Sequence, residues 1–365
     1  MDKQNKNKSA LSVSKGVEQP PSVNPDPLMS FKNRRREKIP VTKFRDGIRE
    51  GNISLLSQAI TLIESSLPEH QEVAGELVEE CLPLSGNSVR IGITGVPGVG
   101  KSYFIDSFGK ILTRGGARLA VLAVDPSSER SKGSILGDKT RMEELSADTS
   151  AFIRPSPSGG SLGGVAKKTR ESIILCEAAG FDTIIVETVG VGQSETAVHS
   201  MVDFFLLLML AGAGDELQGI KRGIMEMADL IAITKSDGNN MVRADLARSQ
   251  YQGALELFPP SASGWVPRVQ TCSSLKKEGL NEIHDTIREY FEFSRSSGFF
   301  MQNRREQSLY WMHESIGQQL KEGFYKDPLI AGELEAIRND VVQGRISSFT
   351  AAGKLLGKYF DRRSK

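Results

Sequence analysis

Residues 90–102 read RIGITGVPGVGKS, and this stretch decides the fold. Its first five residues, with two isoleucines and a threonine, have the β-branched composition of a strand, and its last eight match the pattern GxxxxGK[ST]. Three glycines let the backbone turn, so that N–H groups of the loop and of the next helix form a nest for an oxyanion. The stretch therefore predicts a strand, a phosphate-binding loop and a helix, with a plain glycine-rich turn as the alternative.

The loop supplies two kinds of chemistry to a nucleotide. Lys101 brings positive charge to the β- and γ-phosphates, and Ser102 offers a hydroxyl to Mg²⁺, an ion that takes few protein ligands. The residues expected to bind the nucleotide along this segment are Gly95, Val96, Pro97, Gly98, Val99, Gly100, Lys101, Ser102 and Tyr103.

Short β-branched runs alternate with helical stretches from residue 89 to about residue 272. These runs are VRIGIT, RLAVLAV, AFIR, DTIIVE, VDFFLLLML, DLIAIT and RVQTC. Continuous apolar strands that alternate with helices indicate a mostly parallel sheet covered by helices on both faces. The longest apolar run, residues 204–210, is too short for a membrane span, which needs about 20 residues. We therefore expect an α/β protein in which this run is a buried strand.

Acidic residues follow two of these strands, at the sheet edge where such folds gather their ligands. Asp125 comes directly after AVLAV, and Glu187 ends DTIIVE, so both are candidates for the metal and water site, with strand-end capping as the alternative. Asp138 lies in a polar segment that fits a switch or a solvated loop. Gly190 is placed to sense the γ-phosphate, and Val191 stands where Ras-like enzymes carry a water-orienting glutamine, which predicts slow turnover.

The run LIAITKSDG, residues 230–238, resembles the NKxD element of GTPases. The carboxylate of Asp237 can accept from both N1–H and the 2-amino group of guanine, whereas adenine presents an acceptor at N1. The stem of Lys235 can lie over the purine. Thr234 replaces the usual asparagine, which removes an amide able to brace the phosphate loop. After the next strand, the residues that resemble the second base-contacting element of GTPases are Ser273, Ser274 and Leu275.

Composition limits the class of protein. The chain has 365 residues, of which 39% are hydrophobic and 25% charged, as in globular enzymes, and its net charge of +1 selects neither nucleic acid nor membrane. Three cysteines without a CxxC pair do not form a disulfide framework. The N-terminus lacks the apolar stretch of a secretory signal. We expect a cytoplasmic protein.

The texture of the sequence divides the chain into four parts. Residues 1–40 are rich in Ser, Asn, Pro and Lys and fit a mobile tail, whose basic cluster is either a docking site or simply solvated. Residues 41–88 have helical periodicity, and Pro68 separates two of the helices. Residues 89–290 form the nucleotide-binding domain, and residues 291–365 are helical with a break near Tyr325 to Pro328.

Several motifs in their order resemble the MeaB/ArgK (MMAA-like) family of methylmalonyl-CoA mutase-associated GTPases. They are GVPGVGKS, VDPSS, GDKTRM, SPSGGSLGG, VETVGVGQSE and GAGDELQGIKRGI, and the resemblance spans about Val41 to Phe360. It implies a P-loop G domain of the SIMIBI class with an N-terminal helical extension and a C-terminal helical arm that makes a homodimer. It also implies GTP binding and slow hydrolysis that gate the delivery of adenosylcobalamin to an acyl-CoA mutase.

The resemblance assigns roles to individual residues. It implies that Lys101 serves the phosphates, while Ser102, Asp125, Asp138 and Glu187 surround Mg²⁺ and the attacking water. It places Gln218 and Lys221 in the segment that couples the nucleotide state to the mutase; without it, an ordinary polar loop is the simpler interpretation. Two departures from the family pattern are Tyr103, where threonine is common, and Ala211, where proline is usual.

Other functions remain open from sequence. A nickel metallochaperone GTPase is expected to carry a histidine-rich tract or a cysteine pair, and the four histidines here are scattered. A small-molecule kinase or transport ATPase is the interpretation behind the older ArgK name. Either would change the partner, whereas the phosphate loop would stay.

Overall fold

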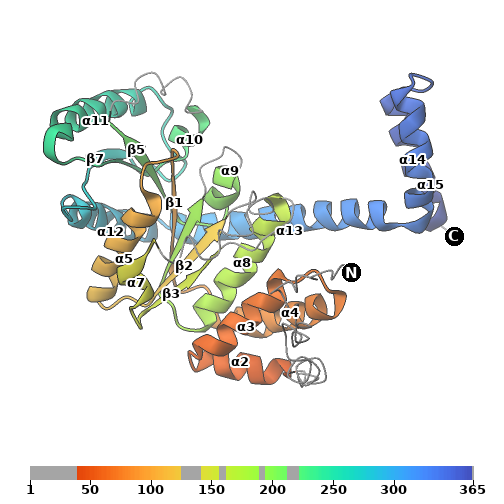
Figure 1. Cartoon of the computed structure of the whole chain (residues 1–365), viewed down its shortest axis with the longest axis horizontal. Coiled ribbons are helices and arrows are strands. Elements are labelled where there is room, and N and C mark those ends of the chain that lie inside the picture. The colour runs from red at the N-terminus through yellow and green to blue at the C-terminus, as the bar shows by residue number, and fades with distance from the viewer. Residues whose placement is uncertain (1–38, 125–140, 156–161, 189–193, 212–221, 364–365) are drawn as a thin grey trace, which may run out of the picture. The chain divides into compact units, whose positions relative to one another are not determined.

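Seven strands form one parallel sheet within residues 41–365 (Figure 1). The computed structural model describes residues 39–124, 141–155, 162–188, 194–211 and 222–363. The strand order is β3-β2-β4-β1-β5-β6-β7. The strands are β1 Val89–Gly95, β2 Leu119–Val124, β3 Ala151–Arg154, β4 Thr183–Thr188, β5 Phe204–Leu210, β6 Leu230–Thr234 and β7 Arg268–Thr271. Each of the seven predicted runs is a strand, so the predicted α/β sheet is confirmed.

Helices cover both faces of this sheet, because alternate strand residues point to opposite sides. Ile91, Phe204 and Leu206 pack with α5 and α12 on one face. Leu207 and Ile231 pack with α10 and α11 on the other face. The helices of the domain are α5 Lys101–Arg114, α7 Glu143–Ser146, α8 Leu162–Ala178, α9 Ser194–His199, α10 Arg222–Glu226, α11 Met241–Leu255 and α12 Leu280–Ser296.

Three helices precede the sheet and pack against α8. They are α2 Val41–Arg49, α3 Ile53–Glu64 and α4 Pro68–Cys81. Asn52 begins α3, since its side chain accepts hydrogen bonds from the N–H groups of Ser54 and Leu55 at 3.0 and 3.1 Å. Pro68 is the first residue of α4, a position at which its missing N–H costs nothing. The helix break predicted at this proline is confirmed.

The helices after α12 are α13 Phe299–Lys326, α14 Pro328–Val342 and α15 Ser348–Arg363. The predicted break near residues 325–328 is present, and Asp327 caps α14 by accepting from Leu329 N at 2.9 Å. Ile330, Leu355 and Tyr359 form a small core between α14 and α15, against the end of α13. Within the described ranges, no helix is long and apolar enough to cross a bilayer.

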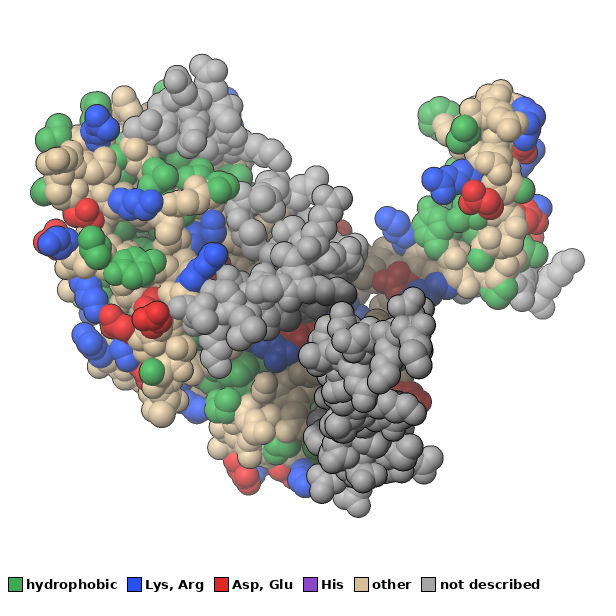
Figure 2. Space-filling model, in the orientation of Figure 1, with side chains coloured by type: hydrophobic (Ala, Val, Ile, Leu, Met, Phe, Trp, Pro, Cys, Tyr) green, Lys and Arg blue, Asp and Glu red, His purple; other side chains and the backbone are tan. Residues whose placement is uncertain are grey.

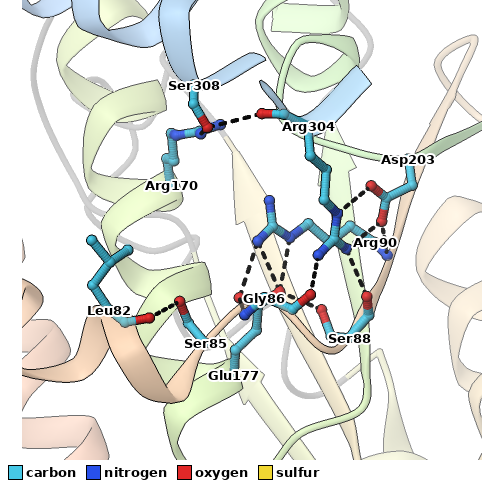
Figure 3. A network of polar contacts seen from close by, with 10 residues as sticks. All are labelled: Leu82, Ser85, Gly86, Ser88, Arg90, Arg170, Glu177, Asp203, Arg304 and Ser308. Atoms are coloured by element: carbon cyan, nitrogen blue, oxygen red, sulfur yellow. Dashed lines mark hydrogen bonds and ion pairs between the residues drawn. The ribbon is translucent and has the colours of Figure 1, made fainter. Parts of the chain in front are cut away.

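A buried network of charged groups joins α13 to the amino end of the sheet (Figure 3). The Arg304 guanidinium donates to both carboxylate oxygens of Asp203, at 2.8 and 2.7 Å, and to the backbone carbonyls of Gly86 and Ser88. Behind it, Arg90 on β1 pairs with Glu177 on α8 at 2.9 Å. These partners come from residues far apart in the sequence, so the network fixes the start of α13 on the sheet.

Candidate functional site

The phosphate loop lies between β1 and α5, at the carboxyl edge of the sheet. Gly95 is required by space, because a Cβ there would stand 2.5 Å from the carbonyl oxygen of Leu208 on β5. Gly98 and Gly100 have φ values of 77° and 90°, in the left-handed region that favours glycine. A Cβ at either of these two would meet nothing within 4 Å. The loop therefore has the backbone form and the open space of an anion cradle.

Lys101 stands at the first position of α5 and is drawn toward this cradle. Its ammonium donates to the carbonyl oxygen of Gly95 at 2.9 Å. Burial lowers the pKa of Lys101, and the negative charges of Glu187 and Glu195 oppose that shift. The N-cap of this helix is Gly100, which has no side chain to cap the first N–H groups. A phosphate at this place would meet one ammonium group and a helix N-terminus.

Ser102 and Glu187 form the described part of the predicted metal site. The Ser102 hydroxyl donates to a carboxylate oxygen of Glu187 at 3.3 Å, and Glu187 is 8% exposed. A hydroxyl and a carboxylate are hard oxygen donors that fit Mg²⁺. Within the residues described, no group of three or more His, Cys, Asp or Glu side chains is gathered as a complete protein metal site. Two oxygen ligands beside a phosphate cradle fit an ion that is shared with a nucleotide.

Glu195 also belongs to the site, although the sequence alone did not indicate where it lies. It lies in the first turn of α9, is 2% exposed, and acts electrostatically on Lys101. The only signal in the sequence was its closeness to the strand that ends in Glu187. Glu195 therefore adds a second carboxylate, besides Glu187, that acts on Lys101.

The loop after β6 is tied to the phosphate loop by two neighbouring side chains. The Thr234 hydroxyl lies 3.0 Å from the carbonyl oxygen of Val99 and donates to it. The Lys235 ammonium donates to the carbonyl oxygen of Gly98 at 2.9 Å. The sequence predicted that Thr234 would remove the brace that an asparagine provides. The structure differs, because the threonine hydroxyl reaches the phosphate loop itself.

Asp237 is held by the loop that follows β7. The Ser273 hydroxyl donates to the Asp237 carboxylate, and it accepts from Lys276 N at 3.1 Å. The carbonyl of Ser274 accepts from Ser107 on α5, and Leu275 is 65% exposed. The two loops are adjacent because β6 and β7 pair in parallel, with Ile233 opposite Thr271. The structure thus brings the predicted base residues Lys235, Asp237, Ser273 and Ser274 to the same edge as Lys101 and Ser102.

Several predicted residues lie outside the described part of the chain. They are Asp125, Asp138, Gly190, Gln218 and Lys221. The last described residue of β2, Val124, pairs with Thr188 beside Glu187, so the strand that leads to Asp125 ends at this edge. Tyr103 is described and is 48% exposed.

Comparison with known proteins agrees with this geometry. The family model of the methylmalonyl-CoA mutase-associated GTPase MeaB matches residues 56–328. GTPase ArgK of Escherichia coli is 45% identical over 318 residues, which are 86% of this chain and 96% of that protein. The mitochondrial methylmalonic aciduria type A homolog of Mus musculus is 45% identical over 337 residues, 90% of this chain and 81% of that protein.

A solved structure supports the fold over the same range. The crystal structure of a LAO/AO transport system kinase has a TM-score of 0.71 and 37% sequence identity, and it covers 88% of this chain and 97% of its own. The family match over residues 56–328 spans the phosphate loop and all seven strands of the sheet. The chain therefore belongs to the MeaB family of methylmalonyl-CoA mutase-associated P-loop GTPases.

Proposed function

We propose that this protein binds and hydrolyses GTP, and that it is the G-protein chaperone of an adenosylcobalamin-dependent acyl-CoA mutase. The observation that carries the nucleotide part is that the segment leading to Asp237 is hydrogen-bonded to the phosphate loop. Thr234 and Lys235 bond to the phosphate loop, and Asp237 follows them with its carboxylate held by Ser273. A carboxylate in this loop, beside the phosphate loop, can accept from N1–H and the 2-amino group of guanine and thereby selects guanine over adenine.

The chemistry of hydrolysis follows from the residues at the carboxyl edge. Ser102 and Glu187, with Asp125 and Asp138 as further expected ligands, would hold Mg²⁺, which neutralises charge on the β- and γ-phosphates. Lys101 exchanges its bond to the Gly95 carbonyl for one to a phosphate oxygen, at little cost because the ammonium is already in place. Glu187 also orients the attacking water in this proposal. GTP and water thus give GDP and phosphate.

The chaperone part rests on membership of the family and on the coupling segment. The most suitable partner is methylmalonyl-CoA mutase, since the family is named for its association with that enzyme. GTP turnover is slow alone, because Val191 stands in place of a glutamine, and it rises when the mutase binds the segment with Gln218 and Lys221. Adenosylcobalamin reaches this protein only through the partner. The setting is the cytoplasm, without nucleic acid or membrane as a partner.

We also propose a homodimer formed by α13, α14 and α15. Leu309, Met312, Ile316 and Leu320 recur every three or four residues along α13 and are 48–57% exposed. Figure 2 shows hydrophobic side chains over α14 and α15, and a groove of about 710 Å³ lies among these three helices. Leu334, Ile337, Leu356 and Phe360 are among its apolar lining residues. An apolar stripe that continues into an apolar groove fits the same surface of a second copy.

Titration of the purified protein with candidate mutases, while GTP turnover is followed, tests the chaperone role. Acceleration by one mutase and not by the others would support it and name the partner. Absence of acceleration by every mutase would contradict it.

The second candidate function is a kinase or transport ATPase, which the name of the 37% identical structure suggests. Competition between GTP and ATP for the site separates the two, because a kinase or transport ATPase should prefer ATP. Preference for GTP supports the GTPase.

A further inference from the structure

Lys235 holds an unusual backbone conformation in the middle of the base-binding loop. Its φ is 57°, in the left-handed region that few residues other than glycine adopt. Such a conformation persists only where surrounding contacts determine it, and it occurs most often at functional sites. At this residue the chain turns away from β6, which sends the lysine side chain back to Gly98 and carries the chain on to Asp237.

One side chain contacts the backbone of Lys235 directly. The side-chain nitrogen of Asn240 donates to the carbonyl oxygen of Lys235 at 2.8 Å. The orientation of this amide is fixed by chemistry, because only its nitrogen can donate to a carbonyl oxygen. Asn240 also closes the turn through its own backbone, whose N–H donates to the carbonyl of Asp237 at 3.0 Å. The six residues from Lys235 to Asn240, which include Asp237, are thus closed into a turn by two hydrogen bonds from Asn240.

Capping of the following helix does not explain the position of the Asn240 side chain. Asn240 lies directly before α11, at the end of the short 3-10 turn Gly238–Asn240, and its backbone is already helical. Its side chain forms no cap bond to α11. The side chain is turned toward Lys235, away from its own helix, so a general need for helix capping does not explain it.

We infer that Asn240 is a positioning residue for guanine recognition, which rests on the proposed GTP site. Its amide holds Lys235 in the left-handed conformation, and this places the Lys235 ammonium on Gly98 and the Asp237 carboxylate opposite Ser273. Without the amide donor, the loop relaxes toward ordinary φ values and Asp237 loses its register against the base. The phosphate cradle itself stays as it is.

Three single variants of the full chain test this role. Asn240→Ala removes the amide, and Asn240→Asp keeps the size of the side chain, removes the donor and adds a negative charge that favours the N-terminus of α11. Asn239→Asp is the matched control, since it adds the same charge one residue earlier at an exposed position. Displacement of a fluorescent GDP analogue gives the affinities for GDP and for inosine diphosphate, which lacks the 2-amino group that Asp237 accepts from. Thermal unfolding is measured beside them.

Both Asn240 variants should bind GDP about five- to tenfold more weakly, the size of one neutral hydrogen bond. Their preference for GDP over inosine diphosphate should fall, and Asn240→Asp should unfold no earlier than the wild type. Asn239→Asp should keep the wild-type values. Wild-type affinity and preference in both Asn240 variants would overturn the inference, as would an equal loss in Asn239→Asp. Failure of the wild-type chain to bind GDP would instead overturn the proposed function and the inference with it.

Discussion

The two edges of the same sheet are built in opposite ways. At the amino edge, Arg304 and Asp203 form a bidentate pair, and the remaining donors of the arginine meet backbone carbonyls. At the carboxyl edge, the one hydrogen bond of the Lys101 ammonium within the described residues goes to the carbonyl of Gly95, and Ser102 reaches Glu187 at 3.3 Å. The first edge carries bonds that no ligand replaces, and the second carries bonds that a nucleotide would exchange for its own. In this parallel sheet, the contacts that stabilise the fold lie at the amino ends of the strands, and the groups that would bind the ligand lie at their carboxyl ends.

Removal of Arg304 should produce the largest loss of stability. Arg304→Met leaves the Asp203 carboxylate buried without its cation, which costs about 3–5 kcal/mol. Urea unfolding measures this change. The exposed neighbour gives the control, since Arg305→Met should stay within about 0.5 kcal/mol. A loss in Arg304→Met no larger than that of the control would show that the amino edge does not hold the fold together.

Removal of Lys101 should lower GTP turnover strongly and leave stability unharmed, the opposite of the result for Arg304. Lys101→Ala takes away the charge that meets the phosphates, and loss of one such donor lowers kcat by about 10²–10³. The unfolding free energy should stay the same or rise, because burial lowers the pKa of Lys101 and the folded state already disfavours its charge. Steady-state GTP hydrolysis and urea unfolding, measured on one preparation, check both expectations. Loss of stability with unchanged turnover would reverse the roles assigned to the two edges.

How far the sequence predicts this molecule depends on the kind of contact. The seven strands and the phosphate loop were predicted because their signals are local: apolar runs, glycine spacing and a lysine followed by a serine. Arg304 and Asp203 were missed, since 101 residues separate them and each alone reads as an ordinary surface charge. Thr234 was recognised as a departure, but its compensating bond to Val99 depends on the packing of two loops. Asn240 was missed because its backbone contact has no sequence signature.

Asp229 lies at the amino edge, directly before β6, and has no cation partner among the residues that the structure describes; it should make stability depend on pH. Burial raises the pKa of Asp229 to about 7, and a hydrogen bond from Phe205 N opposes the shift. The folded chain therefore keeps this proton up to about pH 7, whereas the unfolded chain releases it near pH 4, so stability falls as the pH rises between these values.

Asp229→Asn removes that dependence and tests it. The variant should equal the wild type near pH 4 and become progressively more stable than the wild type as the pH rises towards 8. Unfolding midpoints across this pH range give the comparison, with the low-pH points as the internal control. A constant difference between the two proteins at every pH would show that the Asp229 carboxyl does not titrate in this range.

The brace between the base loop and the phosphate loop should show the smallest effect. Thr234→Val keeps the shape of the side chain and removes the hydroxyl that donates to Val99, which costs about 1 kcal/mol and weakens GDP binding several-fold. Thr234→Ser keeps the hydroxyl and should retain most of the affinity. GDP titration of both variants checks this. Equal affinities would mean that the bond to Val99 does not brace the loop.

The central claim is that the carboxyl edge reads a guanine base through Asp237. Xanthine carries a carbonyl where guanine carries its 2-amino group, so Asp237→Asn offers it a matching amide donor. Competition between GTP and xanthosine triphosphate for the wild type and for this variant is the most direct measurement. The account predicts that the wild type prefers GTP and that the variant prefers xanthosine triphosphate. An unchanged preference in Asp237→Asn would contradict it.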